Sequence, residues 1–337
     1  MIELLKELCA IDGVSGREED VRKFIMEKIK SHAEVKLDGM GNIIAFKKGK
    51  MSPKNKIVFD AHMDEVGLIV TSITDDGYLR FTAVGGIDVS VMIARRVVFQ
   101  NGAVGVIGAK PIHMVSEGDR KKLPKKEDLL IDIGAPDKSA ALQIISIGDT
   151  ASFDNGCQIC DELIKAKAID DRAGCAVLIK MLEEPSECDF YATFCVQEEV
   201  GLRGAKAAMF SVNPDIAVVL EATTAADIEG VDESKRVCAL GNGVAVSFMD
   251  GATLYDKKLY ELAMKTAQKS NIKCQPKASV TGGNNAGSIN VSGDGVRTMG
   301  LSVPCRYIHS PSSVANCEDI KSMYFLAKAL LPILAQL

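Results

Sequence analysis

The sequence has no tryptophan and few other aromatic residues, which together make up 5% of its 337 positions. Carbohydrate-binding platforms and grooves for single-stranded nucleic acid stack their ligands on aromatic side chains, so this scarcity argues against both. The chain also lacks a run of eighteen apolar residues, and its N-terminus has no basic segment followed by an unbroken apolar stretch. It therefore predicts neither a membrane span nor a signal peptide, and we expect a cytoplasmic protein.

An excess of charge of one sign is also lacking. Forty Lys and Arg residues against forty-five Asp and Glu residues leave a net charge of −5, which is too balanced for a nucleic-acid binder. A hydrophobic content of 47% with 25% charged residues is typical of a globular protein, and the length favours two domains. The expected partners are small molecules or peptides.

The ten cysteines are scattered along the chain and do not form a disulfide framework. Several of them, such as Cys175, Cys188 and Cys195, lie within apolar runs, where a reduced thiol behaves as a small hydrophobic side chain. Cys157 and Cys160 form a single CxxC without the second pair that a zinc ribbon needs. We interpret them as ordinary thiols, with a metal or redox motif as the alternative.

Two segments at the N-terminus have helical periodicity, residues 2–10 and 16–31. Ser15 and Glu18 are spaced as a capping box for the second helix. Helices and strands then alternate, apart from a stretch in the middle of the chain. Strands are expected over 42–48, 56–61, 191–196 and 216–220, and helices over 171–184, 202–211 and 318–334.

Residues 70–163 have a different texture, with short β-rich stretches, turn signals such as Asn101-Gly102, and little helical periodicity. The pattern on either side is that of an α/β protein. The sequence therefore predicts an α/β domain, made of residues 1–69 and 164–337, that is interrupted by a small β-rich domain.

Acidic residues and histidines gather at the predicted strand ends and helix starts. His62 ends the strand over 56–61, and Asp170-Asp171, Glu198-Glu199 and Glu221 stand beside other apolar strands. Carboxylates brought together at one edge of a sheet repel each other unless a cation neutralises them. Imidazole with carboxylate suits zinc or cobalt better than calcium or magnesium. The alternative is that these acids cap helices and face solvent.

The ordered motifs resemble those of the cocatalytic metallo-aminopeptidases of the glutamyl and tetrahedral aminopeptidase type, some of which carry the name endoglucanase. The similarity runs from the N-terminal helices to the C-terminus, and an ordered set is more specific than any single match. The motifs are Asp60-Ala-His-Met-Asp-Glu-Val-Gly67, Ala168-Ile-Asp-Asp-Arg-Ala-Gly174, Gln197-Glu-Glu-Val-Gly201, Glu221, and Arg306-Tyr-Ile-His-Ser-Pro311.

The resemblance implies a peptidase domain with a central mixed sheet flanked by helices. It also implies that residues 70–163 form a small β-barrel-like, PDZ-like dimerisation domain. Members of this family are built from dimers, often as a hollow tetrahedral dodecamer that admits short peptides. The implied reaction is hydrolysis of N-terminal residues from such peptides.

The resemblance also implies a site with two divalent ions, Zn²⁺ first, with Co²⁺ or Mn²⁺ as alternatives. Glu198 takes the place of the general base that activates a water between the ions, and Asp64 that of the residue that orients His62. The implied metal ligands are Asp170 between the two ions, His62 and Glu221 on one ion, and Glu199 and His309 on the other.

Three positions depart from the family pattern. Glu221 stands where Asp is usual, and Asn285 stands where the glycine-rich loop normally has Asp. The segment Ser312-Ser-Val314 lacks the acidic residue that often follows the last histidine motif. The departure at Asn285 removes a candidate partner for a substrate ammonium group.

Three other functions compete with an aminopeptidase. An N-acyl amino acid deacylase would use the same ions. A glycoside hydrolase would need two carboxylates flanking a sugar and no metal, which the metal-type histidines argue against. An inactive assembly protein would keep the fold without the chemistry.

Overall fold

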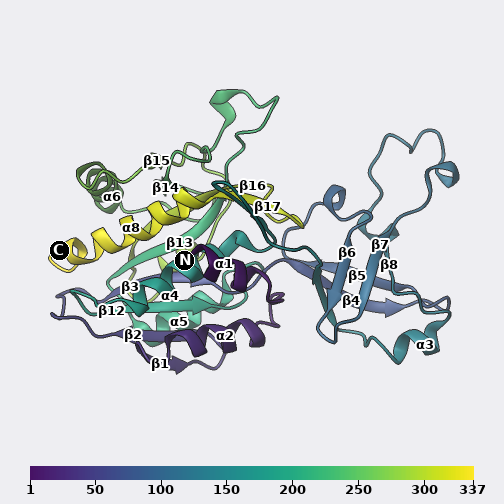
Figure 1. Cartoon of the computed structure of the whole chain (residues 1–337), viewed down its shortest axis with the longest axis horizontal. Helices are drawn as coiled ribbons and strands as arrows, with labels where there is room; N and C mark the ends of the chain where they lie inside the picture. The colour runs from purple at the N-terminus through teal and green to yellow at the C-terminus, as the bar shows by residue number, and fades with distance from the viewer.

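The computed structural model describes residues 1–337, which form two lobes (Figure 1). The larger lobe holds an eleven-stranded mixed sheet, and the smaller lobe is a closed six-stranded barrel. The predicted α/β class, with a central mixed sheet and a small β-barrel, is confirmed.

The centre of the large sheet consists of four parallel strands. Because parallel strands end at the same edge of a sheet, the residues that follow them meet there. Their order is β12 (Phe190–Cys195), β3 (Ile57–His62), β13 (Ile216–Thr224) and β16 (Arg297–Arg306). Outside β12 lie β2 (Ile43–Lys47) and β1 (Glu34–Leu37). Beyond β16 lie β17 (Ser313–Asn316), β11 (Leu163–Ala166) and β10 (Gln158–Cys160), and a branch of β14 (Val244–Ser247) and β15 (Cys274–Pro276).

Helices cover both faces of the large sheet (Figure 1). On one face lie α1 (Ile2–Cys9), α2 (Glu19–Ile29), α4 (Ile169–Glu183), α6 (Lys257–Lys269) and α8 (Cys317–Leu334). The other face packs against α5 (Arg203–Val212) and the short α7 (Ala286–Ile289). None of the helices combines the length and the apolar character needed to cross a membrane.

The barrel has its own core, separate from that of the large sheet. In a barrel strand, successive side chains point alternately into the core and out to solvent. Strand β7 follows this pattern, because Ile107 is buried while Val104 and Val106 are exposed. Its strands are β4 (Gly67–Ile73), β5 (Leu79–Val84), β8 (Leu130–Asp132), β7 (Val104–Gly108), β6 (Arg96–Phe99) and β9 (Thr150–Phe153). The helix α3 (Lys138–Leu142) lies beside them, and β10 and β11 return the chain to the large sheet.

The predicted capping box at the second helix is wrong. Helix α2 begins at Glu19, and no side chain caps it. The Ser15 hydroxyl instead donates to the Asp64 carboxylate at 2.6 Å, and the Glu18 carboxylate accepts from the main-chain N–H of Gln197 at 3.1 Å. Both side chains therefore bind residues beside the carboxyl edge of the sheet rather than the start of their own helix.

Candidate metal centre

The carboxyl edge of the sheet brings together all the predicted site residues. His62 ends β3, Glu221 lies on β13, and Glu198 with Glu199 follows β12 directly. Asp170 lies at the start of α4, where its peptide bond to Asp171 is cis, and His309 follows β16. Segments that are far apart in the sequence thus contribute one side chain or two each.

Asp170 lies between the two histidines. Its Oδ1 is 3.4 Å from His62 Nε2, and its Oδ2 is 3.3 Å from His309 Nε2. On the first side, Glu221 Oε2 lies 3.6 Å from His62 Nε2. On the second side, Glu199 Oε2 lies 3.3 Å from His309 Nε2. The site therefore consists of two imidazole–carboxylate groups that share one aspartate.

Burial makes this concentration of negative charge unfavourable. It raises the pKa of Glu198 to about 7 and, together with the nearby Asp170 charge, that of Glu199 to about 8. The pKa of Glu221 is raised well above its usual value, again by burial first. Burial opposes protonation of His62, but the surrounding carboxylates, Glu221 foremost, raise its pKa well above the usual value. The two histidines can therefore neutralise only part of the negative charge that the carboxylates of the site would carry.

Several carboxylate oxygens of the site are buried and accept no hydrogen bond: Asp170 Oδ1, Asp171 Oδ2 and Glu221 Oε1. A buried oxygen without a partner is unfavourable unless something outside the protein binds it. Two groups of side chains could each hold a metal ion, because the ligand atoms inside each group lie within 4.8 Å of one another. One group consists of His62, Asp170 and Glu199, and the other of Asp170, Asp171 and Glu221. Imidazole and carboxylate donors at this spacing fit divalent transition-metal ions.

The sequence and the fold both match known proteins. The family model for M42 glutamyl aminopeptidases matches residues 41–326. A relative in Acetivibrio thermocellus is 40% identical over 96% of each chain, and the lysyl aminopeptidase of Pyrococcus furiosus is 33% identical over 98% of this chain and 96% of its own. The chain belongs to the M42 aminopeptidase family. Members of this family are metal-dependent peptide hydrolases, so the resemblance inferred from the motifs is confirmed.

Three solved structures share this fold over almost their whole length. An aminopeptidase from Desulfurococcus kamchatkensis superimposes with a TM-score of 0.93 at 36% identity, covering 99% of this chain and 96% of that one. The TET1 peptidase of Pyrococcus horikoshii, which can assemble into a tetrahedron or a large octahedral shell, gives 0.86 at 34%, with 98% of each chain covered. A Thermotoga maritima protein named endoglucanase gives 0.81 at 35%, with 97% and 96% covered. The family assignment favours an aminopeptidase over the deacylase, glycoside hydrolase and inactive alternatives.

In this M42 chain, two buried carboxylates hold the turn that carries Glu198 and Glu199. The Asp64 carboxylate accepts from the main-chain N–H groups of Glu198 at 2.9 Å and Glu199 at 3.1 Å. Glu18 accepts from the preceding N–H, that of Gln197. Three successive amides are thereby bound, which fixes the direction in which the two glutamates leave the turn. Glu18 and its role could not be found from the sequence, because 179 positions separate it from Gln197.

Asn285 is fully buried and does not line the substrate cleft, so an Asp at this position would not face a substrate ammonium group there. Its Nδ2 donates to the Asp60 carboxylate at 2.8 Å, and both side chains are fully buried. Asp60 also accepts from the Thr193 hydroxyl and from the Cys195 thiol. An amide suits this position because a second carboxylate would repel Asp60 there.

A cleft of about 560 Å³ opens beside the metal-type residues. Its lining includes Asp170, Glu198, Glu199 and Glu221, and most of the other lining residues are polar. The glycine-rich loop over 281–284 forms one wall. A small peptide or amino acid derivative fits a cleft of this size and polarity.

The pairing of Asn285 with Asp60 predicts a large effect of a small change. Asn285→Asp places two buried carboxylates against each other, so we expect the free energy of unfolding to fall by about 3 kcal/mol. Urea denaturation of the metal-free protein measures this loss. The exposed Asn271→Asp is the control, and the exchange Asp60→Asn with Asn285→Asp is expected to recover most of the stability. Equal losses in the single variant and the exchange would contradict the account.

Proposed function

We propose that the chain removes N-terminal residues from short peptides, using two divalent ions that share Asp170. His62 and Glu221 would complete one ion's ligands, and Glu199 and His309 those of the other. The observation that carries this proposal is the position of Asp170, whose two oxygens face the two histidines from opposite sides. Zinc suits these donors best, with cobalt or manganese as alternatives. Bound ions would polarise the scissile carbonyl and lower the pKa of water.

Glu198 is the residue that we assign as general base. It lines the cleft, and its Oε2 is 4.0 Å from His62 Nε2, farther away than the nearest oxygens of Asp170 and Glu221. It therefore lies beside the group of ligands, where it can take a proton from the attacking water and deliver it to the departing amine. The main-chain contact with Asp64 holds it in that position.

Asp64 is proposed as a residue that positions His62 and does not touch substrate. His62 Nδ1 lies 3.1 Å from the main-chain oxygen of Asp64 and 3.4 Å from its carboxylate. A proton on Nδ1 satisfies these oxygens and leaves Nε2 free to bind on the side of the site. Nearby His62 and Ser15 outweigh the effect of burial and keep the pKa of Asp64 below its usual value, so its carboxylate stays ionised.

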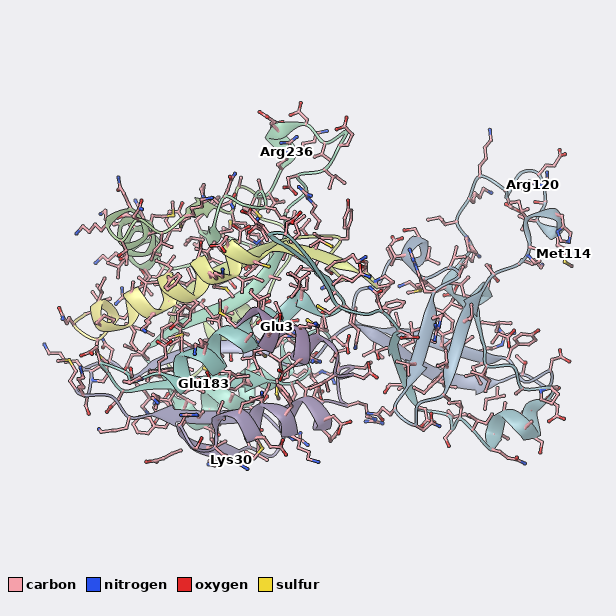
Figure 2. All side chains as sticks on the ribbon, viewed as in Figure 1. Glu3, Lys30, Met114, Arg120, Glu183 and Arg236 are labelled. Carbon is pink, nitrogen blue, oxygen red and sulfur yellow. The ribbon has the colours of Figure 1, made fainter.

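The barrel is proposed as the element that joins copies of this chain into a homo-oligomer. It contributes none of the imidazole or carboxylate groups gathered around Asp170, and its one polar contact with them is the main-chain oxygen of Gly86, 3.0 Å from His309 Nδ1. It exposes apolar side chains on β7 and on the loop that Figure 2 shows with Met114 and Arg120. The Pyrococcus horikoshii TET1 peptidase, which can assemble into a tetrahedron or a large octahedral shell, has the same fold. The division of the chain near residues 70 and 163 and the cytoplasmic location stay predictions. The barrel strands run from Gly67 to Phe153, and β10 already pairs with β11 in the large sheet.

Removal of metal tests the proposed function. Protein loaded with zinc or cobalt is expected to hydrolyse aminoacyl-p-nitroanilides, and a chelator is expected to abolish this activity because the ions take part in the reaction. Re-addition of the ion restores it. Rates are followed by the absorbance of the released nitroaniline. Hydrolysis that survives complete metal removal, or cleavage of a β-glucan without metal, would contradict the proposal.

Glu198→Gln separates a base from a ligand. The substitution keeps the size of the side chain but removes its proton acceptor, so kcat is expected to fall by on the order of a hundredfold or more. Metal content, measured by mass spectrometry of the dialysed protein, is expected to stay at two ions per chain. Glu199→Gln is the matched comparison and is expected to lose one ion. The opposite result would exchange the two roles.

Charge placed on the barrel tests its part in assembly. Val106→Glu combined with Met114→Glu puts carboxylates on exposed apolar positions, so a contact between barrels would be weakened. Analytical ultracentrifugation is expected to show a smaller assembly, with the fold of each chain preserved. Thr82→Glu, on an exposed position of β5, is the control. An unchanged assembly in the double variant would exclude this surface as the contact.

A further inference from the structure

The glycine-rich loop that lines the cleft ends in a buried amide, Asn284, which is 7% exposed. It is the one side-chain amide among the residues that line this cleft. A peptide substrate offers carbonyl oxygens as hydrogen-bond acceptors, and an amide N–H suits them without adding charge to the site. The number of its N–H groups that the protein leaves free therefore decides whether Asn284 can bind substrate.

The orientation of the Asn284 amide follows from its neighbours. Its Oδ1 accepts from the main-chain N–H of Ala286 at 2.9 Å, at the start of α7. Turning the amide over would place its NH₂ group against that N–H, donor against donor, so the turned orientation is unfavourable. Nδ2 therefore lies on the side of the Tyr255 hydroxyl, to which it donates at 3.1 Å.

The Tyr255 hydroxyl can only accept from Asn284, because its single proton is used elsewhere. It donates that proton to Asp250 Oδ2 at 2.6 Å. Burial first, and then the Asp250 charge, raise the pKa of Tyr255 well above its usual value, so the hydroxyl keeps its proton. Asp250 is itself held, since its Oδ1 accepts from the main-chain N–H groups of Ala252 and Thr253. This series of hydrogen bonds fixes the direction of the amide.

One N–H of Asn284 remains without an acceptor. Nδ2 carries two hydrogens, and the Tyr255 hydroxyl is its only hydrogen-bond partner in the protein. The loop beside it is also held in place, because the main-chain N–H of Gly251 donates to the main-chain oxygen of Gly282 at 2.7 Å. A buried N–H without an acceptor is unfavourable. An oriented and unused donor at the edge of a cleft therefore indicates a contact with a ligand.

We propose that Asn284 donates its second N–H to a main-chain carbonyl oxygen of the bound peptide, the carbonyl that follows the scissile bond. This inference rests on the proposed aminopeptidase function, in which the scissile carbonyl lies against the metal-type residues, so the next carbonyl needs a donor of its own. Asn284 then favours peptides over amides that lack the second carbonyl. Tyr255 and Asp250 act as positioning residues, since they hold the amide without touching substrate.

Two leucyl amides separate this contact from the rest of the reaction. Leucylglycinamide has the second carbonyl, and leucyl propylamide has the same length without it. For Asn284→Ala we expect the ratio of their kcat/KM values to fall by about twofold to tenfold, the range for a neutral hydrogen bond. Tyr255→Phe, which frees the amide to turn, is expected to lower the same ratio. The exposed Asn242→Ala and the α6 variant Tyr260→Phe are the matched controls, and both are expected to leave it unchanged.

Released leucine is measured by liquid chromatography with metal-loaded protein. The proposal is overturned if the ratio changes by less than about twofold in Asn284→Ala, even where both rates decline together, because an equal decline is the pattern of a structural role. Circular dichroism checks the fold, and Asn284→Ser replaces the Ala variant if that variant does not fold. The serine hydroxyl keeps an acceptor for the Ala286 N–H, and Tyr255 takes its one proton, so none is left for substrate.

If the wild type hydrolyses neither amide, the proposed function fails separately. Calorimetric titration of the two amides into wild type and Asn284→Ala then decides the question. A preference for leucylglycinamide that is lost in the variant supports the inference, and equal or absent binding of the two amides by the wild type rejects it.

Discussion

The repulsion among buried carboxylates at the carboxyl edge of the sheet is the constraint on which the rest of this structure depends. Asp170, Glu198, Glu199 and Glu221 converge there within a few ångströms of two histidines. Moving a carboxylate out of water costs several kcal/mol even after relaxation, and neighbouring charges of the same sign add to this. The histidines offset only part of the cost. Divalent cations are the compensation that best matches the donors and their unpaired oxygens.

The surrounding protein holds these groups in place against their repulsion. Asp64 and Glu18 bind three successive amides of the turn after β12. Asp60 and Asn285 join the strand that ends in His62 to the loop beside the cleft. Lys167 connects Glu65 to Asp12, which in turn accepts from Ser152 of the barrel strand β9. The lobes are therefore joined by a polar network that begins next to the site.

The sequence predicted the helices and strands that have strong periodicity. It also predicted that acidic residues and histidines gather at the edge of the sheet where the parallel strands end. An apolar run such as Ile57–Phe59, which leads through Asp60 and Ala61 to His62, indicates a buried strand, and the structure confirms that strand. Hydrogen bonds between side chains that are far apart in the sequence were not predictable. Ser15 has the spacing of a helix cap, yet it bonds to Asp64, because a nearby carboxylate competes with the helix end for its hydroxyl. The surroundings of Asn285 depend on tertiary packing that the spacing of residues in the sequence does not encode.

The central claim is that Asp170 lies between two metal ions. Anomalous X-ray diffraction from crystals of the zinc-loaded protein, with data on both sides of the zinc absorption edge, tests it most directly. The account predicts two peaks that flank the Asp170 carboxylate, one beside His62 and Glu221 and the other beside Glu199 and His309. A single peak on one side of Asp170, or peaks away from this aspartate, would contradict it.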